Sequence, residues 1–203
     1  MKKIFDENNP LMRALSIAAD LLFLNLLTLL CSLPVVTAGA ALSALCDSVQ
    51  HIVRDEQSYL IKAYFRSFRS NLFKGSLLGL IFLAAAVLVY LDWLAASAYA
   101  PALRFSAAAV GVIVLAVALY AFALQARYEN TIGATLKNAA TLMVAYFPRT
   151  AGMVVCTLAI WLIALHFLRY ALPLLLMFGI SLPCYVCALL YQEIFEKMEK
   201  TDK

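Results

Sequence analysis

Residues 34–53, with the sequence PVVTAGAALSALCDSVQHIV, decide how many times this chain crosses a membrane. The segment is apolar over most of its length, but its side chains are small and it contains Asp47 and His51. If the segment does not cross, the basic residues of 54–74 lie on the side opposite the N-terminus. If it crosses, those basic residues lie on the same side as the N-terminus.

The composition is that of a membrane protein. The chain has 203 residues, of which 65% are hydrophobic and 14% are charged, and its formal net charge is +4. Soluble domains are about 45–50% apolar and about 25% charged. The difference excludes a soluble globular enzyme, a disordered protein and a nucleic-acid-binding protein, and it predicts a polytopic membrane protein.

The apolar stretches have the length that a membrane-spanning helix needs, about 20 residues. Together with the small-residue segment they give six predicted spans, at residues 14–33, 34–53, 75–94, 105–126, 150–168 and 171–191. Of the 16 Lys and Arg residues, all except Arg104 and Arg169 then lie on one side. Cytoplasmic loops carry the excess of Lys and Arg, so six spans are favoured and both termini are predicted to be cytoplasmic.

The predicted fold is an all-α bundle of six transmembrane helices, arranged as three hairpins in a single membrane domain over residues 1–203. The external connections are short, at Leu33-Pro34, at 95–104 and at Arg169-Tyr170. They leave no room for an extracellular domain.

The first connection is predicted to be a tight hairpin turn. Pro34 disfavours helix at the residue before it and suits the first turn of the next helix. Thr37 can satisfy a free backbone group, and Gly39 permits close packing of helices.

Two cytoplasmic segments, 55–74 and 129–149, are predicted to form amphipathic helices. Each carries apolar residues at i, i+4, i+7 and i+11, which are Ile61, Phe65, Phe68 and Leu72 in the first and Ile132, Leu136, Ala139 and Met143 in the second. Basic side chains accompany them, namely Lys62, Arg66, Arg69 and Lys137. These helices either lie on the anionic inner leaflet or dock a soluble partner.

Four polar residues fall inside the first two predicted spans: Asp20, Asn25, Asp47 and His51. Asp20 and Asp47 have matching depths, and His51 follows Asp47 by one helical turn. One interpretation is a site that handles protons or cations, because intramembrane ionisable groups are costly. The other is a structural polar contact between helices, for which the Asn25 amide is also suited.

The sequence contains no recognisable motif for catalysis, metal binding or a cofactor. Its five cysteines all fall in predicted spans, which excludes a secreted disulfide framework. Cys184 and Cys187 form a C-x-x-C directly after Pro183. Either this pair performs thiol chemistry or the cysteines are small packing residues beside a proline.

The run from Asn25 to Gly39, with Ser32-Leu33-Pro34-Val35-Val36-Thr37 at its centre, resembles the signature of the YesL-like family of bacterial integral membrane proteins, a domain family of unknown function. The basic aromatic stretch Tyr64-Phe65-Arg66-Ser67-Phe68-Arg69 is similar to the stretch that follows in that family. The resemblance implies a bacterial cell membrane protein with a role in carbohydrate acquisition, because such proteins are often encoded beside uptake systems of the ABC class. It implies no catalytic residue.

Three functional hypotheses follow. The first is a non-enzymatic accessory component of ABC-type carbohydrate uptake that contacts a permease, an ATPase or a sensor kinase through a cytoplasmic segment. The second is a small stand-alone transporter or channel with Asp20, Asp47 and His51 on its path. The third is a membrane thiol oxidoreductase that uses the C-x-x-C. Membrane lipid and further copies of the chain are expected partners, since lipid supplies no hydrophobic drive between helices.

Overall fold

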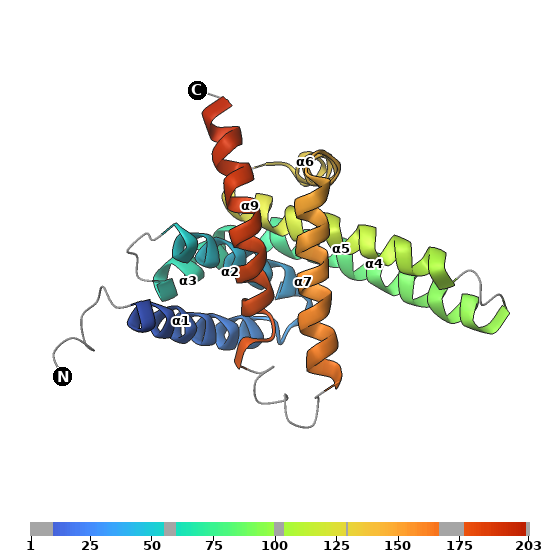
Figure 1. Cartoon of the computed structure of the whole chain (residues 1–203), viewed down its shortest axis with the longest axis horizontal. Helices are drawn as coiled ribbons and strands as arrows, with labels where there is room; N and C mark the ends of the chain where they lie inside the picture. Colours follow the sequence, from blue (N-terminus) through green and yellow to red (C-terminus); the bar gives the residue numbers. More distant parts are fainter. Residues whose placement is uncertain (1–9, 55–59, 100–103, 129, 167–176, 202–203) are drawn as a thin grey trace.

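The computed structural model describes residues 10–54, 60–99, 104–128, 130–166 and 177–201, and the regular structure in these ranges is all helical (Figure 1). The elements in chain order are α1 (Pro10–Cys31), the 3-10 turn η2 (Val35–Thr37), α2 (Ala38–Val53), α3 (Leu60–Ser70), α4 (Leu72–Tyr99), α5 (Arg104–Arg127), α6 (Ile132–Ala145), α7 (Phe147–His166) and α9 (Ser181–Thr201). The all-α prediction is confirmed for these residues.

Helix α2 lies at the centre of the molecule, where it contacts α1, α3, α4, α5 and α9. Its sequence is rich in Gly, Ala, Ser and Cys, and most of its residues are buried. Small side chains let several helix backbones approach one another closely. The segment whose place in the fold was hardest to predict therefore forms the core.

Helices α2 and α4 contact each other closely, at three glycines. A Cβ atom built on Gly39 would lie 2.1 Å from the carbonyl oxygen of Gly75 and 2.6 Å from the Cα of Gly79. Both of these atoms belong to the backbone, so no side chain can turn aside to make room. The glycines permit a crossing that any larger residue would push apart.

The turn between α1 and α2 is held by Thr37. The Thr37 hydroxyl lies 2.8 Å from the carbonyl oxygen of Cys31 and 2.9 Å from that of Pro34. The last carbonyl groups of a helix have no partner within the helix. The Thr37 side chain satisfies one of these groups at the end of α1.

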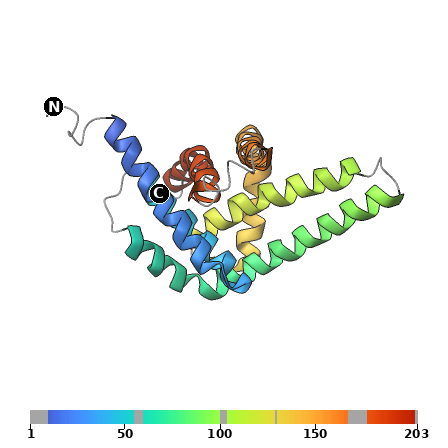
Figure 2. The same cartoon turned by 90° about the horizontal axis from the view of Figure 1, so that it is seen from below.

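Helices that follow one another in the chain contact each other in pairs, but the pairs run in different directions. Helices α4 and α5 lie along each other and extend away from the rest of the molecule (Figures 1 and 2). Helices α7 and α9 also contact each other, and they run across the direction of α4 and α5 in both views. Arg149 at the start of α7 pairs with Glu193 of α9. The described pairs therefore do not form one parallel bundle.

The last predicted span, 171–191, differs from the helix that the structure describes. A turn at Gly179 and Ile180 precedes α9, which begins at Ser181 and continues ten residues past the predicted end. Pro183 suits the first turn of a helix, where its missing N–H is not needed. The predicted connection at Arg169-Tyr170 and residues 171–176 lie outside the described residues.

Both predicted amphipathic segments are also interrupted. In the first, α3 ends at Ser70, Asn71 forms a turn, and α4 begins at Leu72. In the second, α6 ends at Ala145 and α7 begins at Phe147. Here Pro148 in the first turn of α7 favours a new helix. In the first segment the apolar pattern continued past the break to Leu72, so it did not reveal the change of direction, and in the second it ended at Met143, before the break.

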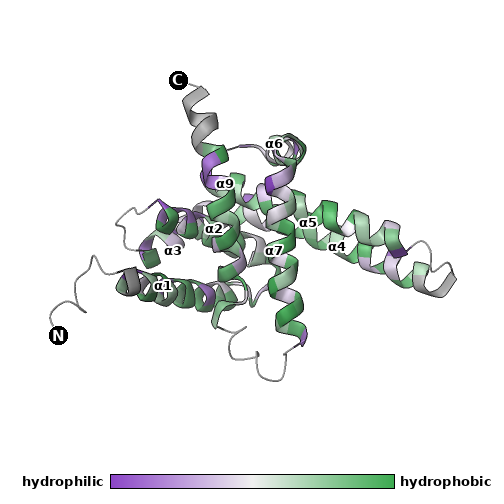
Figure 3. Ribbon diagram, viewed as in Figure 1, coloured by the Kyte–Doolittle hydropathy of each residue, from purple (hydrophilic) through white to green (hydrophobic). Residues whose placement is uncertain are grey.

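Four helices are long and apolar enough to cross a membrane: Met12–Cys31, Leu72–Ala96, Arg104–Arg127 and Phe147–His166. Hydrophobic residues cover most of α4, α5 and α7, whereas hydrophilic residues gather on α3 and toward the C-terminal part of α9 (Figure 3). These apolar helices are compatible with an integral membrane protein. The arrangement of six spans stays a prediction.

Candidate functional site

A polar cavity of about 330 Å³ lies where the end of α2, the junction of α3 with α4 and the end of α5 come together. In the topology predicted from the distribution of Lys and Arg, this end of the helices faces the cytoplasm. The lining side chains are mostly charged or hydrogen-bonding, and they are Asp47, Arg66, Ser67, Ser70, Asn71, Lys74, Gln125, Ala126, Arg127 and Tyr128. In a chain that is 65% hydrophobic, such a concentration of polar groups makes this cavity the leading candidate site.

Hydrogen bonds connect the helices at the base of the cavity. Gln125 is buried, and its side-chain nitrogen donates to Asn71 Oδ1 at 3.3 Å. Its side-chain oxygen accepts from the Thr135 hydroxyl at 3.4 Å, which brings in α6. Asn71 in turn donates to the Ser67 hydroxyl at 3.4 Å. The turn at Asn71 is thereby joined to α3, α5 and α6.

The cavity is positively charged. Arg66, Lys74 and Arg127 line it, and Asp47 is the one carboxylate among the described lining residues. The Arg127 guanidinium lies 5.2 Å from the centre of the Phe195 ring and 5.9 Å from that of Tyr128. Cations favour the faces of aromatic rings, so these two rings help to orient Arg127.

The four polar residues predicted to lie inside the membrane do not form a single site. Asp47 lines the cavity, and Nε2 of His51 lies 3.9 Å from Asp47 Oδ1. Asp20 on α1 does not line this cavity. Asn25 is fully buried, and its Oδ1 accepts hydrogen bonds from the backbone N–H groups of Ile180 and Ser181. Asn25 therefore has a structural contact in this fold, at the start of α9.

Helix α3 turns a mixed face toward the bundle and an apolar, basic face away from it. Ala63, Tyr64 and Ser67 are buried, whereas Ile61 and Phe65 are 53% and 46% exposed. Burial raises the pKa of the Tyr64 phenol above its ordinary value, which keeps the group protonated. The predicted basic residues Lys62, Arg66, Arg69 and, on α6, Lys137 are all exposed.

The two cysteines of the C-x-x-C, Cys184 and Cys187, contact residues of two other helices. All five are free thiols. The Sγ of Cys184 lies 3.4 Å from that of Cys46 on α2, and the Sγ of Cys187 lies 3.5 Å from the Thr157 hydroxyl on α7. The close sulfur pair is thus Cys46 and Cys184.

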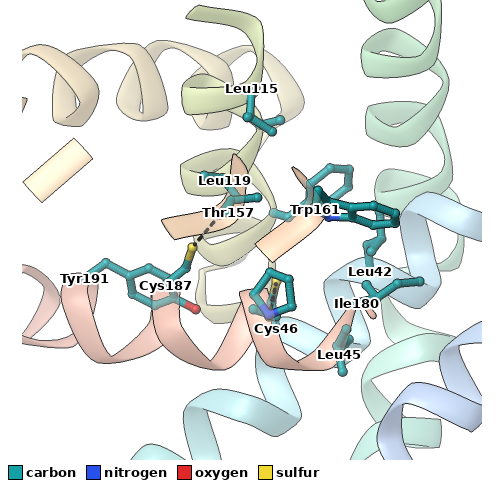
Figure 4. Close-up of a pocket in the computed structure, with 14 residues that line it drawn as sticks. Leu42, Leu45, Cys46, Leu115, Leu119, Thr157, Trp161, Ile180, Cys187 and Tyr191 are labelled. Carbon is teal, nitrogen blue, oxygen red and sulfur yellow. Dashed lines mark hydrogen bonds between the residues drawn. The ribbon is translucent and has the colours of Figure 1, made fainter. Parts of the chain in front are cut away.

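These sulfur contacts lie on the wall of a second cavity, of about 320 Å³, between α2, α5, α7 and α9 (Figure 4). Apart from its thiols and a few polar groups the lining is apolar, with Leu42, Leu45, Leu119, Phe122 and Trp161 among its members. In Figure 4, Thr157 and Cys187 are joined by a hydrogen bond from α7 to α9. This cavity suits hydrocarbon better than a polar substrate.

Sequence reasoning missed most of the polar cavity. It named Asp47 and Arg66, but not Asn71, Lys74 or Gln125. One signal was present, because Gln125 is an uncharged polar residue at the end of a long apolar run, and buried amides need a partner. The identity of that partner depends on how α5 meets the turn between α3 and α4.

Comparison with known proteins reaches only part of the chain. Residues 21–93 match a family described as a protein of unknown function, DUF624. The matched segment runs from α1 into α4, so it includes the turn at Thr37, the glycine contact and the Asp47, Arg66 and Lys74 side of the cavity. No curated protein and no solved structure matches the chain.

Proposed function

We propose that this chain is a non-enzymatic accessory component of a bacterial carbohydrate uptake system of the ABC class, embedded in the cell membrane with both termini in the cytoplasm. The observation that carries the proposal is the outer face of α3. There Ile61 and Phe65 are exposed beside Lys62 and Arg69, on a short helix that is not long enough to cross a bilayer.

An exposed face that mixes large apolar and basic side chains needs a surface to cover it. Exposed apolar residues rimmed by polar ones are typical of interaction sites on proteins or membranes. On the predicted cytoplasmic side, the outer face of α3 can contact the anionic inner leaflet and a partner subunit together. A permease, an ATPase or a sensor kinase is the expected partner.

The assignment to carbohydrate uptake rests on fewer observations than the accessory role does. It rests on the resemblance of residues 25–39 to the YesL-like signature, and the match to a family of unknown function over residues 21–93 is compatible with it. The family match names no substrate. The carbohydrate role is therefore the part of the proposal that experiment must supply.

The accessory role is favoured over a stand-alone transporter by what lies next to the polar cavity. One and two turns along α2 from Asp47, toward the opposite end of the helix, Ala44 and Ala40 are fully buried and apolar. Leu45, also fully buried, continues this apolar packing. A translocation path needs polar groups along its length, and the lining described here ends near one end of α2.

The C-x-x-C enzyme is also less favoured than the accessory role, because Cys184 and Cys187 contact different helices.

The test is a tagged pull-down from the native host, in mild detergent, after growth on a complex glycan. Mass spectrometry should recover ABC permease or ATPase subunits, or a sensor kinase, in amounts near equal to the tagged chain. The double variant Lys62→Gln/Arg69→Gln should lose the partner, because it removes charge from the outer face of α3. Lys137→Gln, an exposed basic residue of α6, should retain it.

Recovery of the chain alone, or only with further copies of itself, would overturn the accessory role. Flux measurements in liposomes with Asp47→Asn would then decide whether the chain transports a solute. Retention of the partner by the α3 double variant would instead show that docking uses another surface.

A further inference from the structure

The polar cavity gathers cations from three different segments of the chain. Arg66 comes from α3, Lys74 from the first turn of α4, and Arg127 from the end of α5. Against these three charges the described lining offers the single carboxylate of Asp47. Arg66 interacts with Asp47, and Arg127 lies over the Phe195 ring, but three cationic side chains around one cavity still give it a potential that attracts anions.

We infer that the cavity between α2, α3, α4 and α5 binds the phosphate group of a polyol phosphate ester. This inference goes beyond the proposed accessory function and concerns a different surface. The proposed partner contacts the outer face of α3, whereas the cavity lies on the side of α3 where Ser67 faces the bundle.

Phosphate is the anion whose chemistry fits the lining best. Arginine presents a planar fork of N–H donors that matches two phosphate oxygens, and lysine binds phosphate as a point charge. The hydroxyl groups of Ser67, Ser70 and Tyr128 also line this space. The Ser70 hydroxyl donates to the Ser67 carbonyl oxygen at 2.9 Å, and Ser67 hydrogen-bonds to Asp47, so the contacts to phosphate fall mainly to the cations. A carboxylate ligand would use fewer of these donors, because it has only two oxygens.

The carboxylate of Asp47 favours an ester of a polyol over inorganic phosphate as the ligand. An ionised carboxylate accepts hydrogen bonds and repels phosphate oxygens. Within the protein Asp47 already interacts with Ser67, His51 and Arg66, but a carboxylate has about four acceptor sites, so it can also accept a hydrogen bond from a hydroxyl group of the ligand. The volume of about 330 Å³ falls within the range of small-ligand pockets, about 300–1,000 Å³, and leaves room for a polyol beside the phosphate.

The position of the cavity allows two sources of this chemistry. Basic pockets at the cytoplasmic ends of membrane helices bind anionic lipid headgroups. A phosphorylated polyol from the cytoplasm would reach the same opening, since Arg66 and Lys74 are exposed. Phosphatidylglycerol and glycerol 3-phosphate represent these sources, and they share the glycerol phosphate group.

The experiment uses the full chain in nanodiscs of two compositions. In discs of phosphatidylcholine alone, glycerol 3-phosphate and inorganic phosphate are titrated by calorimetry. In discs that also contain phosphatidylglycerol, retained lipid is counted by native mass spectrometry. The test variant is Arg66→Gln/Lys74→Gln, and the matched control is Arg13→Gln/Lys137→Gln, which removes the same charge from exposed positions that neither line the cavity nor lie on α3.

The wild type and the matched control should bind alike. The test variant should bind about ten- to a hundredfold more weakly, as expected when charged hydrogen bonds to an anion are lost. Binding of glycerol 3-phosphate in neutral discs identifies a soluble ester. Retention of phosphatidylglycerol without such binding identifies the lipid headgroup.

Asp47→Asn tests the contact with the polyol independently of the contact with the phosphate. This variant should lose the preference for glycerol 3-phosphate over inorganic phosphate, while its affinity for inorganic phosphate stays equal or rises. If neither probe binds the wild type, or if the test variant and the matched control lose binding equally, the inference is overturned. The pull-down on the α3 outer face is unaffected by that result.

Discussion

The side-chain oxygen of Asn25 lies 3.0 Å from the backbone nitrogen of Ser181, the first residue of α9. The same oxygen lies 2.9 Å from the backbone nitrogen of Ile180. The first N–H groups of a helix have no partner within the helix, and in a low-dielectric interior each costs free energy if it stays unpaired. A buried amide on α1 thus supplies the cap for a helix that begins after a turn.

Replacing this amide should loosen the start of α9. We expect Asn25→Leu to leave the two N–H groups of Ile180 and Ser181 without an acceptor and to cost about 1–3 kcal/mol of folding free energy. Hydrogen exchange in detergent micelles should show faster exchange of these two amides. Thr28→Val is the matched control, because Thr28 is also buried on α1 but donates to Leu24 of its own helix. Equal exchange in both variants would contradict the cap.

The glycine contact predicts that an added methyl group destabilises the fold at Gly39 but not at Gly133. Gly39→Ala places a Cβ against the backbone of Gly75 and Gly79, so α2 and α4 must move apart. Overpacking of this kind costs about 1–3 kcal/mol, and the Tm measured in detergent should fall by several degrees.

Gly133 provides the control for that substitution. It lies in α6 with no atom within 4 Å of an added Cβ. Alanine is the better helix former by about 0.5–1 kcal/mol, so Gly133→Ala should leave the Tm unchanged or raise it. A fall of equal size in both variants would show that α2 and α4 do not meet at Gly39.

The sulfur pair predicts a specific cross-link. With Cys46 and Cys184 sulfurs 3.4 Å apart, a membrane-permeant oxidant such as copper phenanthroline should join them and tie α2 to α9. When the S–S bond forms, the two thiols give two electrons to the oxidant and release two protons to the solvent. Peptide mapping without reduction should find this link.

Single substitutions distinguish that link from a reaction within the C-x-x-C. Cys184→Ser should abolish the cross-link, while Cys187→Ser should leave it, because Cys187 contacts Thr157 instead. A link between Cys184 and Cys187 in the wild type would restore the C-x-x-C hypothesis.

The number of spans is tested by labelling from outside the cell. In a background without the native cysteines, Val36→Cys should react with a membrane-impermeant maleimide in intact cells, because Val36 is exposed in a turn that is predicted to lie outside the membrane. Lys62→Cys on α3 should react only after the cells are opened. Labelling of Lys62→Cys in intact cells would mean that residues 34–53 do not cross the membrane.

Much of the fold could be predicted from local pattern. Apolar length predicted the helices, Pro34 and Thr37 mark the turn between α1 and α2, and Thr131 caps α6 by accepting from the N–H of Ala134. Each of these features depends on residues that are close in the sequence. Periodicity failed at Asn71, where a single turn residue ends α3 without changing the apolar spacing.

The sequence by itself determined the helical class, the apolar character of four long helices, the first turn and the small residues that allow close packing. Only the tertiary structure decided that Asn25 caps α9, that Cys184 meets Cys46, and that Gln125 joins Asn71 at a basic cavity. These partners are separated by 54 to 156 residues. A helical pattern specifies which face of each helix is buried, but the choice of neighbour depends on how α2, the helix with the smallest side chains, lets the others approach.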